Sequence, residues 1–396
     1  MIRKCLKISL ITTDMQSKKL IFTILSMSLL TVMAGAAIAP ALGRINEHFA
    51  GENPVLVQLI LSMPALFIII STFFFGALCR RFSTRTIALI GLIGYVVTGA
   101  GAFFVDGIVP MLILRALLGV CVGMIMPLST GLLTYYFPPE EQASLMGLSG
   151  AMNQLGGVIA NLLAGLLAGI SWNFAFIVYL LGIVAIVLVL RYLPAEHINS
   201  SGRISLKLLG KYHGSVVALF LLMIVFFVYP TNFAVSASRL TALSPNVITI
   251  IMVSLDFVAC IVGLVFGSMM KLMPKTMKYL APLLFTCAYL LLGLHPEVWA
   301  LALGSAIIGV ATGVGLPYLN TVASFKGGKD AAATVMPLMS AALYLGQFIS
   351  PLVVLPLGNA IFGNADATAP FKTAAIFAAV FLLYTIVCRK NLQTAS

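Results

Sequence analysis

The chain has 396 residues, of which 61% are hydrophobic and only 9% are charged, and its mean hydropathy is +1.10. A water-soluble domain needs more polar residues than this to cover its surface, so the composition excludes a soluble protein and indicates a protein of the lipid bilayer. The formal charge of +12 would suit a nucleic-acid partner, but the basic residues collect on one side of the apolar segments described next, which argues against that partner.

Twelve apolar segments are long enough to cross a membrane as helices, because about 30 Å of hydrocarbon requires roughly 20 helical residues. The segments are continuous and rich in Leu, Ile and Ala, which predicts helices and not the alternating strands of a membrane barrel. The predicted fold class is an all-α membrane protein with twelve transmembrane helices. In chain order we place them at 20–42, 55–78, 86–105, 110–134, 143–169, 173–193, 214–237, 246–270, 279–294, 297–323, 332–358 and 370–388.

The 23 Lys and Arg residues indicate how the segments are oriented. Nearly all lie in the first 19 residues, in the loops that follow even-numbered segments, or in the C-terminal tail. The opposite side has only Arg44, Arg239 and Lys372, and Arg115 lies within a segment. The positive-inside rule therefore predicts that both termini and the central loop are cytoplasmic, in a multi-pass protein of the cytoplasmic (inner) membrane.

The residues that could carry enzymatic or metal chemistry are dispersed. The six cysteines form no CxxC pair, which argues against disulfides and zinc. The four histidines fall in connections or at segment ends, and no nucleophile, base and orienting group can be assembled from the sequence. We therefore expect no enzyme, no metal and no cofactor.

Three pairs of segments match at a nearly constant offset, which indicates an internal duplication. Two of the pairs align Gly76 with Gly267, 191 residues apart, and Gly156 with Gly346, 190 residues apart. The third pair, "GVCVGMIMPLST" and "GVATGVGLPYLNT", aligns Gly119, Gly123 and Pro127 with Gly309, Gly313 and Pro317. Glycines one turn apart let helices approach closely and slide, although ordinary helix packing alone would also account for them.

The duplication predicts two six-helix bundles, at residues 20–193 and 214–388. Around them we expect a cytoplasmic N-terminal segment (1–19), a cytoplasmic linker (194–213) and a cytoplasmic tail (389–396). Parallel repeats of this kind place a substrate path between the halves near the bilayer midplane. The organisation is therefore that of a transporter.

With these features the chain resembles the major facilitator superfamily over essentially its whole length, and most closely the twelve-helix branch of drug and metabolite antiporters. The first segment ends in the pattern "AIAPALGRI", which is similar to that branch. The loop after the second segment resembles the family motif G-x-L-x-D-R-x-G-R-K through Gly76, Arg81 and Arg85. Arg80 stands where the family has an acid, so the cytoplasmic gate that the resemblance implies at this loop must be altered or replaced.

Other family motifs are matched unevenly. Arg115 and Gly119 resemble the R-x-x-x-G motif, which implies a part for Arg115 in proton coupling. The G-P-x-x-G-G motif of proton antiporters is largely missing, because Asn161 replaces its proline and only Gly165 is retained. "SWNFAF", from residue 171, resembles the family's start of the sixth helix. The first segment also has no acid, so uniport and uptake stay open beside antiport.

Asp256 is the one acidic residue at the centre of an apolar segment. An ionised carboxylate there costs about 2.5–3.5 kcal/mol on insertion scales, so it must be neutral, paired or facing water. Thr249, Gly263 and Gly267 share its helical face, which directs it toward a protein-lined interior. Asp256 is therefore a candidate for proton coupling or for substrate charge. The alternative is a structural carboxylate that links two helices.

The remaining candidates are one cation and several neutral polar side chains. Arg115 is a candidate for proton coupling or substrate charge, or else a structural donor to carbonyls at a helix end, and its contact with Asp256 is left open. Pro127, Pro230 and Pro317 predict interrupted helices near the midplane. Each polar candidate for the cavity is equally compatible with a bridge between helices: Gln58, Asn153, Gln154, Asn161, Tyr229, Asn232, Tyr318, Asn320, Tyr344 and Gln347.

The sequence thus predicts a secondary active transporter that works by alternating access. The function we expect is proton-linked export of small amphipathic organic compounds, as in drug or metabolite efflux, with Asp256 carrying the proton. The alternative is a uniporter, importer or exchanger of a small organic anion or other metabolite, with Arg115 or backbone dipoles as the counter-charge. The expected partners are a small-molecule substrate, protons and the lipid bilayer, without nucleic acid, and we expect a monomer.

Overall fold

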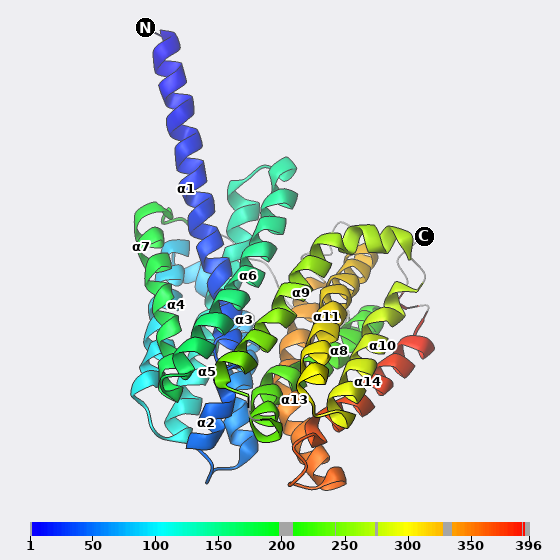
Figure 1. The fold of residues 1–396 in the computed structure, drawn as a ribbon. Helices are drawn as coiled ribbons and strands as arrows, with labels where there is room; N and C mark the ends of the chain where they lie inside the picture. Colours follow the sequence, from blue (N-terminus) through cyan, green and yellow to red (C-terminus); the bar gives the residue numbers. More distant parts are fainter. Residues whose placement is uncertain are drawn as a thin grey trace.

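The computed structural model describes residues 2–197, 209–241, 243–273, 276–327, 335–389 and 391–392 (Figure 1). Within these residues twelve helical stretches are long and apolar enough to cross a membrane, and no strand is present, which confirms the predicted fold class. The elements are α1 (Ile2–Ala36), α2 (Leu42–His48), α3 (Pro54–Arg81), α4 (Thr84–Gly101), η1 (Ala102–Phe104), α5 (Ile108–Tyr136), α6 (Pro139–Ala168), η2 (Trp172–Leu181), α7 (Gly182–Tyr192), α8 (Leu209–Leu240), α9 (Pro245–Leu272), α10 (Met277–Leu294), α11 (Val298–Gly327), α13 (Met336–Phe362) and α14 (Ala369–Val387).

Several helices begin where capping residues stop the chain from being helical earlier. The Asn53 side chain accepts a hydrogen bond from the Val55 amide at 2.9 Å, and Pro54 occupies the first position of α3. Ser83 accepts from the Thr86 amide at 3.3 Å at the start of α4. These caps explain why the two helices begin within two residues of the predicted starts.

Two predicted spans are less regular than expected. The first prediction, 20–42, runs through a break, because α1 ends at Ala36 and the short helix α2 begins at Leu42. At its other end α1 extends back to Ile2, so the N-terminal segment continues the first helix. The sixth span starts as a 3-10 helix, η2, and becomes α-helical only at Gly182.

The expected interruption of helices at prolines is wrong. The helices α5, α8 and α11 run through Pro127, Pro230 and Pro317 respectively. A proline inside a helix frees the carbonyl four residues earlier, and in lipid that group needs another donor. In α8 the freed carbonyl is that of Phe226; the Tyr289 hydroxyl lies 3.5 Å from its oxygen and donates at 2.7 Å to the carbonyl oxygen of Val225, one residue earlier. A neighbouring helix thus supplies a donor to the carbonyls that precede Pro230.

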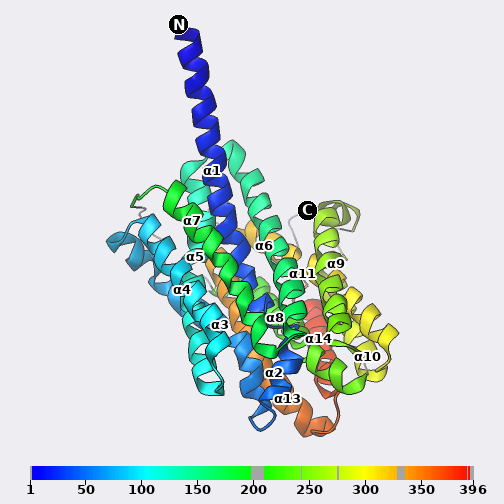
Figure 2. The same ribbon diagram turned by 60° about the vertical axis from the view of Figure 1, so that its left-hand side comes forward.

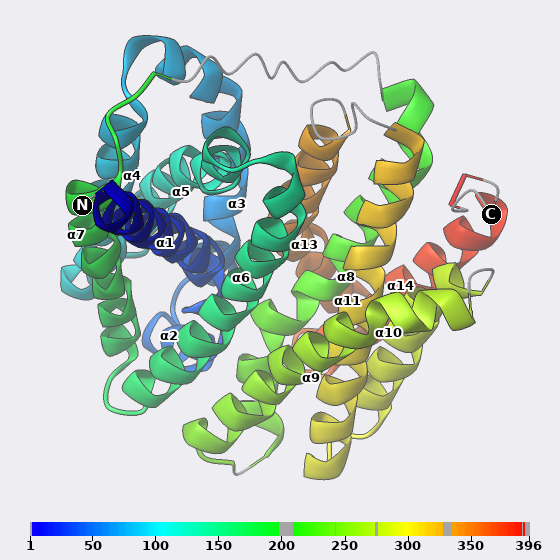
Figure 3. The same cartoon turned by 90° about the horizontal axis from the view of Figure 1, so that it is seen from above.

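The helices form two groups that lie side by side (Figure 3). Equivalent pairs pack in each group: α3 with α5 and α9 with α11, then α1 with α6 and α8 with α13, then α4 with α7 and α10 with α14. Between the groups, α6 packs on α9 and α3 packs on α13. We call α1–α7 the N-half and α8–α14 the C-half.

The two ends of the structure differ in charge. α1 starts at one end, and α2 lies at the other (Figures 1 and 2). We call the first the basic end, because Arg80, Arg81, Arg191, Lys271 and Arg389 lie at helix termini there. We call the second the α2 end.

The repeat-related glycines of α5 and α11 lie where these helices pack closely on α3 and α9. A Cβ atom on Gly123 of α5 would lie 2.8 Å from the Ile68 carbonyl oxygen of α3. In the C-half, a Cβ atom on Gly309 of α11 would lie 2.6 Å from the Leu255 carbonyl oxygen of α9. A Cβ atom on Gly119 of α5 would likewise collide with the Pro64 backbone of α3, and one on Gly313 of α11 would lie 2.7 Å from the Ala259 carbonyl oxygen of α9. Any side chain at these positions would push the backbones apart.

Candidate functional site

The interface between α6 and α9 joins the two halves along one face of each helix. At the α2 end the contact is tight: a Cβ atom on Gly165 would lie 2.7 Å from the Cβ atom of Thr249, and one on Gly169 would lie 3.2 Å from Asn246 Oδ1. Only a glycine at residue 165 allows this approach. The α2 end is therefore closed between α6 and α9.

Asp256 lies two turns further along α9, on the face that carries Thr249. The Asn161 side chain of α6 donates a hydrogen bond from Nδ2 to Asp256 Oδ2. Asn161 is 7% exposed, and its Oδ1 atom is buried without a partner among the described residues. The hydroxyl of Tyr229 lies within electrostatic reach of Asp256. One carboxylate of the C-half is thus held by one amide of the N-half.

Beyond this hydrogen bond the two helices part toward the basic end (Figures 1 and 2). Gly150 lies on the α6 face that carries Asn161, and Gly263 and Gly267 lie on the α9 face that carries Asp256. A Cβ atom added to any of these three glycines would meet no atom within 4 Å. The pair Asn161–Asp256 therefore marks the boundary between the packed and the separated parts of the interface.

A second polar contact crosses between the halves nearer the α2 end. The Gln58 side chain of α3 donates from Nε2 to Asn232 Oδ1 of α8 at 2.6 Å. The orientation of the Asn232 amide is determined by its other contact, since its Nδ2 donates to the Val228 carbonyl oxygen at 3.0 Å. Gln58 must then present its nitrogen to Asn232, and its Oε1 atom is buried without a partner among the described residues.

Gln58 and Asn232 line a cavity of about 580 Å³ that faces the α2 end between the halves. This volume is within the range of ligand sites, and the lining is rich in amides. Other polar residues that line it are Asn46, Glu52, Asn53, Ser236, Arg239, Asn359, Asn364 and Asp366. The two side chains thus lie between this cavity and the interior of the molecule.

The two polar candidates nearer the basic end, Tyr344 and Gln347, make weak hydrogen bonds to methionine sulfur atoms. The Tyr344 hydroxyl of α13 donates to Met126 Sδ of α5 at 3.0 Å and so joins the two halves. Gln347 lies one turn further along α13, with its Nε2 atom 4.0 Å from Met223 Sδ within the C-half. A thioether is a weak acceptor, so both side chains retain hydrogen-bonding capacity for another molecule.

Arg115 lies away from the interface, in the core of the N-half. Its side chain is 0% exposed, and Nη1 donates to the Tyr179 hydroxyl at 2.8 Å. The guanidinium lies 5.0 Å from the ring centre of Phe176 and 4.9 Å from that of Tyr179, as in a cation–π contact. Tyr179 in turn donates to the Ala34 carbonyl oxygen, at the end of α1, at 2.8 Å. The structure therefore ties Arg115 to η2 and α1, whereas Asp256 bonds to Asn161.

Four other predicted cavity residues lie at different places in the two halves. The Thr31 hydroxyl donates to Asn153 Oδ1 at 3.1 Å within the N-half, and Gln154 beside it is exposed. The Tyr229 and Ser305 hydroxyls lie 2.7 Å apart within the C-half. Asn320, on α11, is partly exposed.

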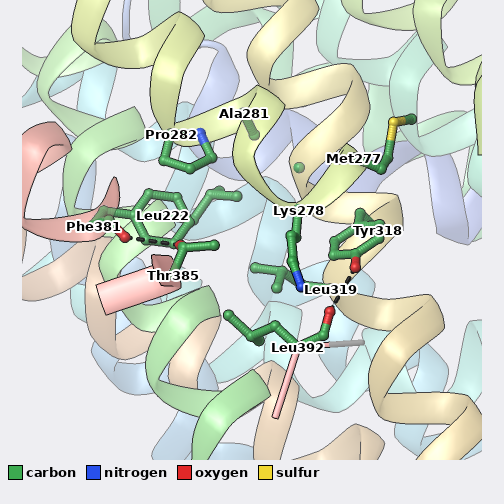
Figure 4. A pocket seen from close by; sticks show the side chains of 11 residues that line it. Leu222, Met277, Lys278, Ala281, Pro282, Tyr318, Leu319, Phe381, Thr385 and Leu392 are labelled. Carbon is green, nitrogen blue, oxygen red and sulfur yellow. Dashed lines mark hydrogen bonds between the residues drawn. The ribbon is translucent and has the colours of Figure 1, made fainter. Parts of the chain in front are cut away.

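Tyr318 binds the C-terminal tail at the basic end of the C-half (Figure 4). Its hydroxyl donates to the Leu392 carbonyl oxygen at 2.6 Å, and Lys278 Nζ donates to the Arg389 carbonyl oxygen at 3.1 Å. The Leu392 side chain is 1% exposed and packs beside Leu222. The sequence presents Lys278 only as one more basic residue at a segment end, and nothing in its pattern marks the tail as its partner.

The loop that resembles the family's gate motif lies at the basic end of α3 and α4. Gly76 lies on α3, and Arg80 and Arg81 at its end are exposed. Arg85 donates from Nη2 to the Leu190 carbonyl oxygen near the end of α7, where a cation is favoured by the helix dipole. Among the described residues, no three His, Cys, Asp or Glu side chains are grouped as for a metal ion.

Sequence comparison places this architecture among known proteins. The model of the Major Facilitator Superfamily matches residues 24–351. The chain is 23% identical over 173 residues to multidrug resistance protein 3 of Bacillus subtilis (strain 168), and 24% identical over 137 residues to the hexuronate transporter of the same organism. These alignments span 41% and 33% of this chain and 32% of each of those proteins.

Structural comparison agrees at the level of the fold. A mutant of the nucleoside transporter NupG has a TM-score of 0.77 to this structure, over 93% of this chain and 99% of that one. The two sequences are 12% identical, so the likeness concerns the fold alone. Since the family model covers most of the sequence and the twelve helices form two equivalent halves, the chain belongs to the Major Facilitator Superfamily and is a multi-pass membrane protein.

Proposed function

We propose that this transporter is a proton-linked exporter of small amphipathic organic compounds, and that Asp256 carries the proton. The observation that supports the proposal most directly is the hydrogen bond between Asp256 and Asn161, where the two halves part. A group that gains and loses charge at this place acts on the contact that alternating access must break and remake. The amide and thioether side chains around the interface suit an uncharged or cationic substrate better than an anion.

The proposed orientation places the basic end in the cytoplasm, because basic residues gather there. The α2 end is then extracytoplasmic, and the structure, closed at that end, faces inward. We propose the cytoplasmic membrane as the location and a monomer as the functional unit, since both halves that form the interface belong to one chain.

A second candidate is transport of a small organic anion by uniport, import or exchange. It is favoured by the relative named hexuronate transporter and by two buried guanidinium nitrogens of Arg115, Nε and Nη2, that have no hydrogen-bond partner among the described residues. It is weakened by the distance in the fold between Arg115 and the interface, because the guanidinium is enclosed by Phe176 and Tyr179.

Proton flux in liposomes tests both candidates. Purified protein is reconstituted with a pH-sensitive dye inside, a pH gradient is imposed, and ethidium, glucuronate or uridine is added as a representative cation, anion or nucleoside. The variants are Asp256→Asn and, as a matched control at an exposed acid outside the spans, Glu297→Gln. We expect ethidium to release protons through the wild type and Glu297→Gln but not through Asp256→Asn.

Three other results would decide against the proposal. Equal proton flux in all three proteins would remove Asp256 from proton coupling. Movement of ethidium without proton flux would indicate a uniporter. Movement of glucuronate alone would select the anion transporter.

A further inference from the structure

We propose that Asn161 is the positioning residue through which the proton on Asp256 controls closure of the α2 end. This inference rests on the proposed function and adds the regulation of the same site. Asn161 belongs to α6 of the N-half and Asp256 to α9 of the C-half, so their hydrogen bond is a direct tie between the two moving bodies. The protonation state of Asp256 in the C-half therefore changes the strength of a contact with the N-half.

The hydrogen bond between Asn161 and Asp256 lies at the boundary between the packed and the separated parts of the interface, so its strength affects whether the packed part stays closed. On its α2 side the helices are packed, with Gly165 against Thr249. On its basic side Gly150 and Gly263 face open space. The hydrogen bond is thus the contact between α6 and α9 that lies nearest to the point where they separate. When this bond weakens, the packed part of the interface at the α2 end can open more easily.

Because the partner of Asp256 is a neutral amide, the strength of this hydrogen bond depends on the charge of Asp256 and needs no second ion. An ionised Asp256 accepts a charge-assisted hydrogen bond from Asn161 Nδ2, and such bonds are roughly twice as strong as neutral ones. A protonated Asp256 offers only a neutral bond, either as acceptor or, after rotation of the amide, as donor to Asn161 Oδ1. The ionised form therefore holds the α2 end closed more firmly, and proton binding loosens it.

The titratable and charged groups on the helices around Asp256 do not replace Asn161 as its partner. The helices packed against α9 are α6, α8 and α11. From α8, the Tyr229 hydroxyl is within electrostatic reach of Asp256 and is paired with Ser305. From α11, the titratable Tyr318 is bonded to the tail at the basic end. Among the described residues, no Lys, Arg or His side chain forms an ion pair with Asp256, so Asn161 is its polar partner.

Accessibility of the α2 end at different pH values tests the inference without a known substrate. Ser236 lines the cavity at that end and is 4% exposed, so a cysteine there should react faster with a membrane-impermeant maleimide when the end opens. The reaction rate of Ser236→Cys is measured from pH 5 to 9 in liposomes. In parallel, infrared difference spectra follow the carboxyl band that Asp256→Asn removes.

The test variant and its control replace two asparagines of the same helix, α6. Asn161→Leu removes the amide between the halves and keeps a similar volume, whereas Asn153→Leu removes an amide of the same helix that bonds to Thr31 within the N-half. Asn161→Gln retains the amide. We expect labelling of the otherwise wild-type chain to be roughly 3- to 10-fold faster when Asp256 is protonated. Asn161→Leu should be fast at every pH, Asn153→Leu should keep the wild-type profile, and Asn161→Gln should restore part of it.

The outcomes separate this inference from the function on which it rests. If the carboxyl band titrates and Asn161→Leu keeps the wild-type labelling profile, the role of Asn161 is refuted while Asp256 stays a proton carrier. If the band does not titrate, both proposals fail. Should Asn161→Leu not fold, Asn161→Ala removes the same amide and leaves Asp256 intact, and a wild-type labelling profile in that variant refutes the inference.

Discussion

Replacement of Gly165 by alanine should shift the transporter toward the state that is open at the α2 end. The added Cβ would collide with Cγ2 and Oγ1 of Thr249 and lie 2.7 Å from its Cβ, whereas ordinary contacts begin at 3.4 Å, so α6 and α9 must separate by at least about 0.7 Å. Overpacking of this kind costs about 1–3 kcal/mol. The cost applies only while the helices are in contact, so the ratio of open to closed molecules should rise roughly 5- to 150-fold.

Pulsed electron paramagnetic resonance can measure this shift. Spin labels are attached to cysteines at Glu52 in the N-half and Asn364 in the C-half, two exposed residues of the cavity rim, in a chain whose native cysteines are replaced. The wild type should show mainly the shorter distance. Gly165→Ala should add a longer one, and Thr249→Gly should cancel the change, because it removes the atoms that collide.

Two further glycines of α6 serve as controls. Gly150→Ala has open space around its Cβ and should leave the distances unchanged. Gly156→Ala would collide with the Leu29 backbone inside the N-half, so it should lower thermal stability without adding the longer distance. A distance distribution in Gly165→Ala that equals the wild type would show that the contact with Thr249 does not hold the α2 end closed.

Three other changes have definite expected outcomes. Tyr179→Phe removes the acceptor of Arg115 and should destabilise the chain by about 1–3 kcal/mol, as read from thermal unfolding in detergent; an unchanged melting temperature would show that the cation–π contacts suffice. Burial raises the pKa of Asp366, but hydrogen bonds, first that from Lys372 at 2.7 Å, outweigh it and hold this pKa below its usual value. This partly exposed pair should therefore contribute up to about 1 kcal/mol that is present above about pH 4 and lost below it, so the stability difference between wild type and Asp366→Asn should shrink on acidification; a difference that grows there would contradict the sign. Leu392→Ala should cost about 2–5 kcal/mol because the side chain is buried, and proteolysis of the tail should accelerate with it; equal cleavage rates would show that the tail is not held by this side chain.

The fold was largely predictable because membrane helices are specified by local composition. Each span needs enough consecutive apolar residues, and those runs can be counted in the sequence. The break after Ala36 was not predictable in this way, since residues 34–41 are as apolar as the helix before them. The continuity of α8 through Pro230 was missed for another reason: the donor to a carbonyl near the proline is Tyr289, a residue of a different helix.

The candidate site was predictable only in part. The direction of Asp256 follows from the small and polar residues that share its helical face, Thr249 among them. Its pairing with Asn161 does not, because periodicity says which face a residue occupies and not which helix lies opposite in a given conformational state. The same limit applies to Tyr318, whose partner is a backbone carbonyl of the tail and therefore has no signature in the sequence.

The enclosure of Arg115 by η2 has a consequence for how the protein is made. The helix that carries Arg115 leaves the ribosome before Tyr179, which follows 64 residues later. At about 5–20 residues per second, synthesis of that stretch takes roughly 3 to 13 s. During this time a lone guanidinium in lipid costs about 2.5–3.5 kcal/mol. The first six spans are therefore expected to be retained together at the insertion machinery until the aromatic enclosure of the cation is complete, and not released into the bilayer one by one.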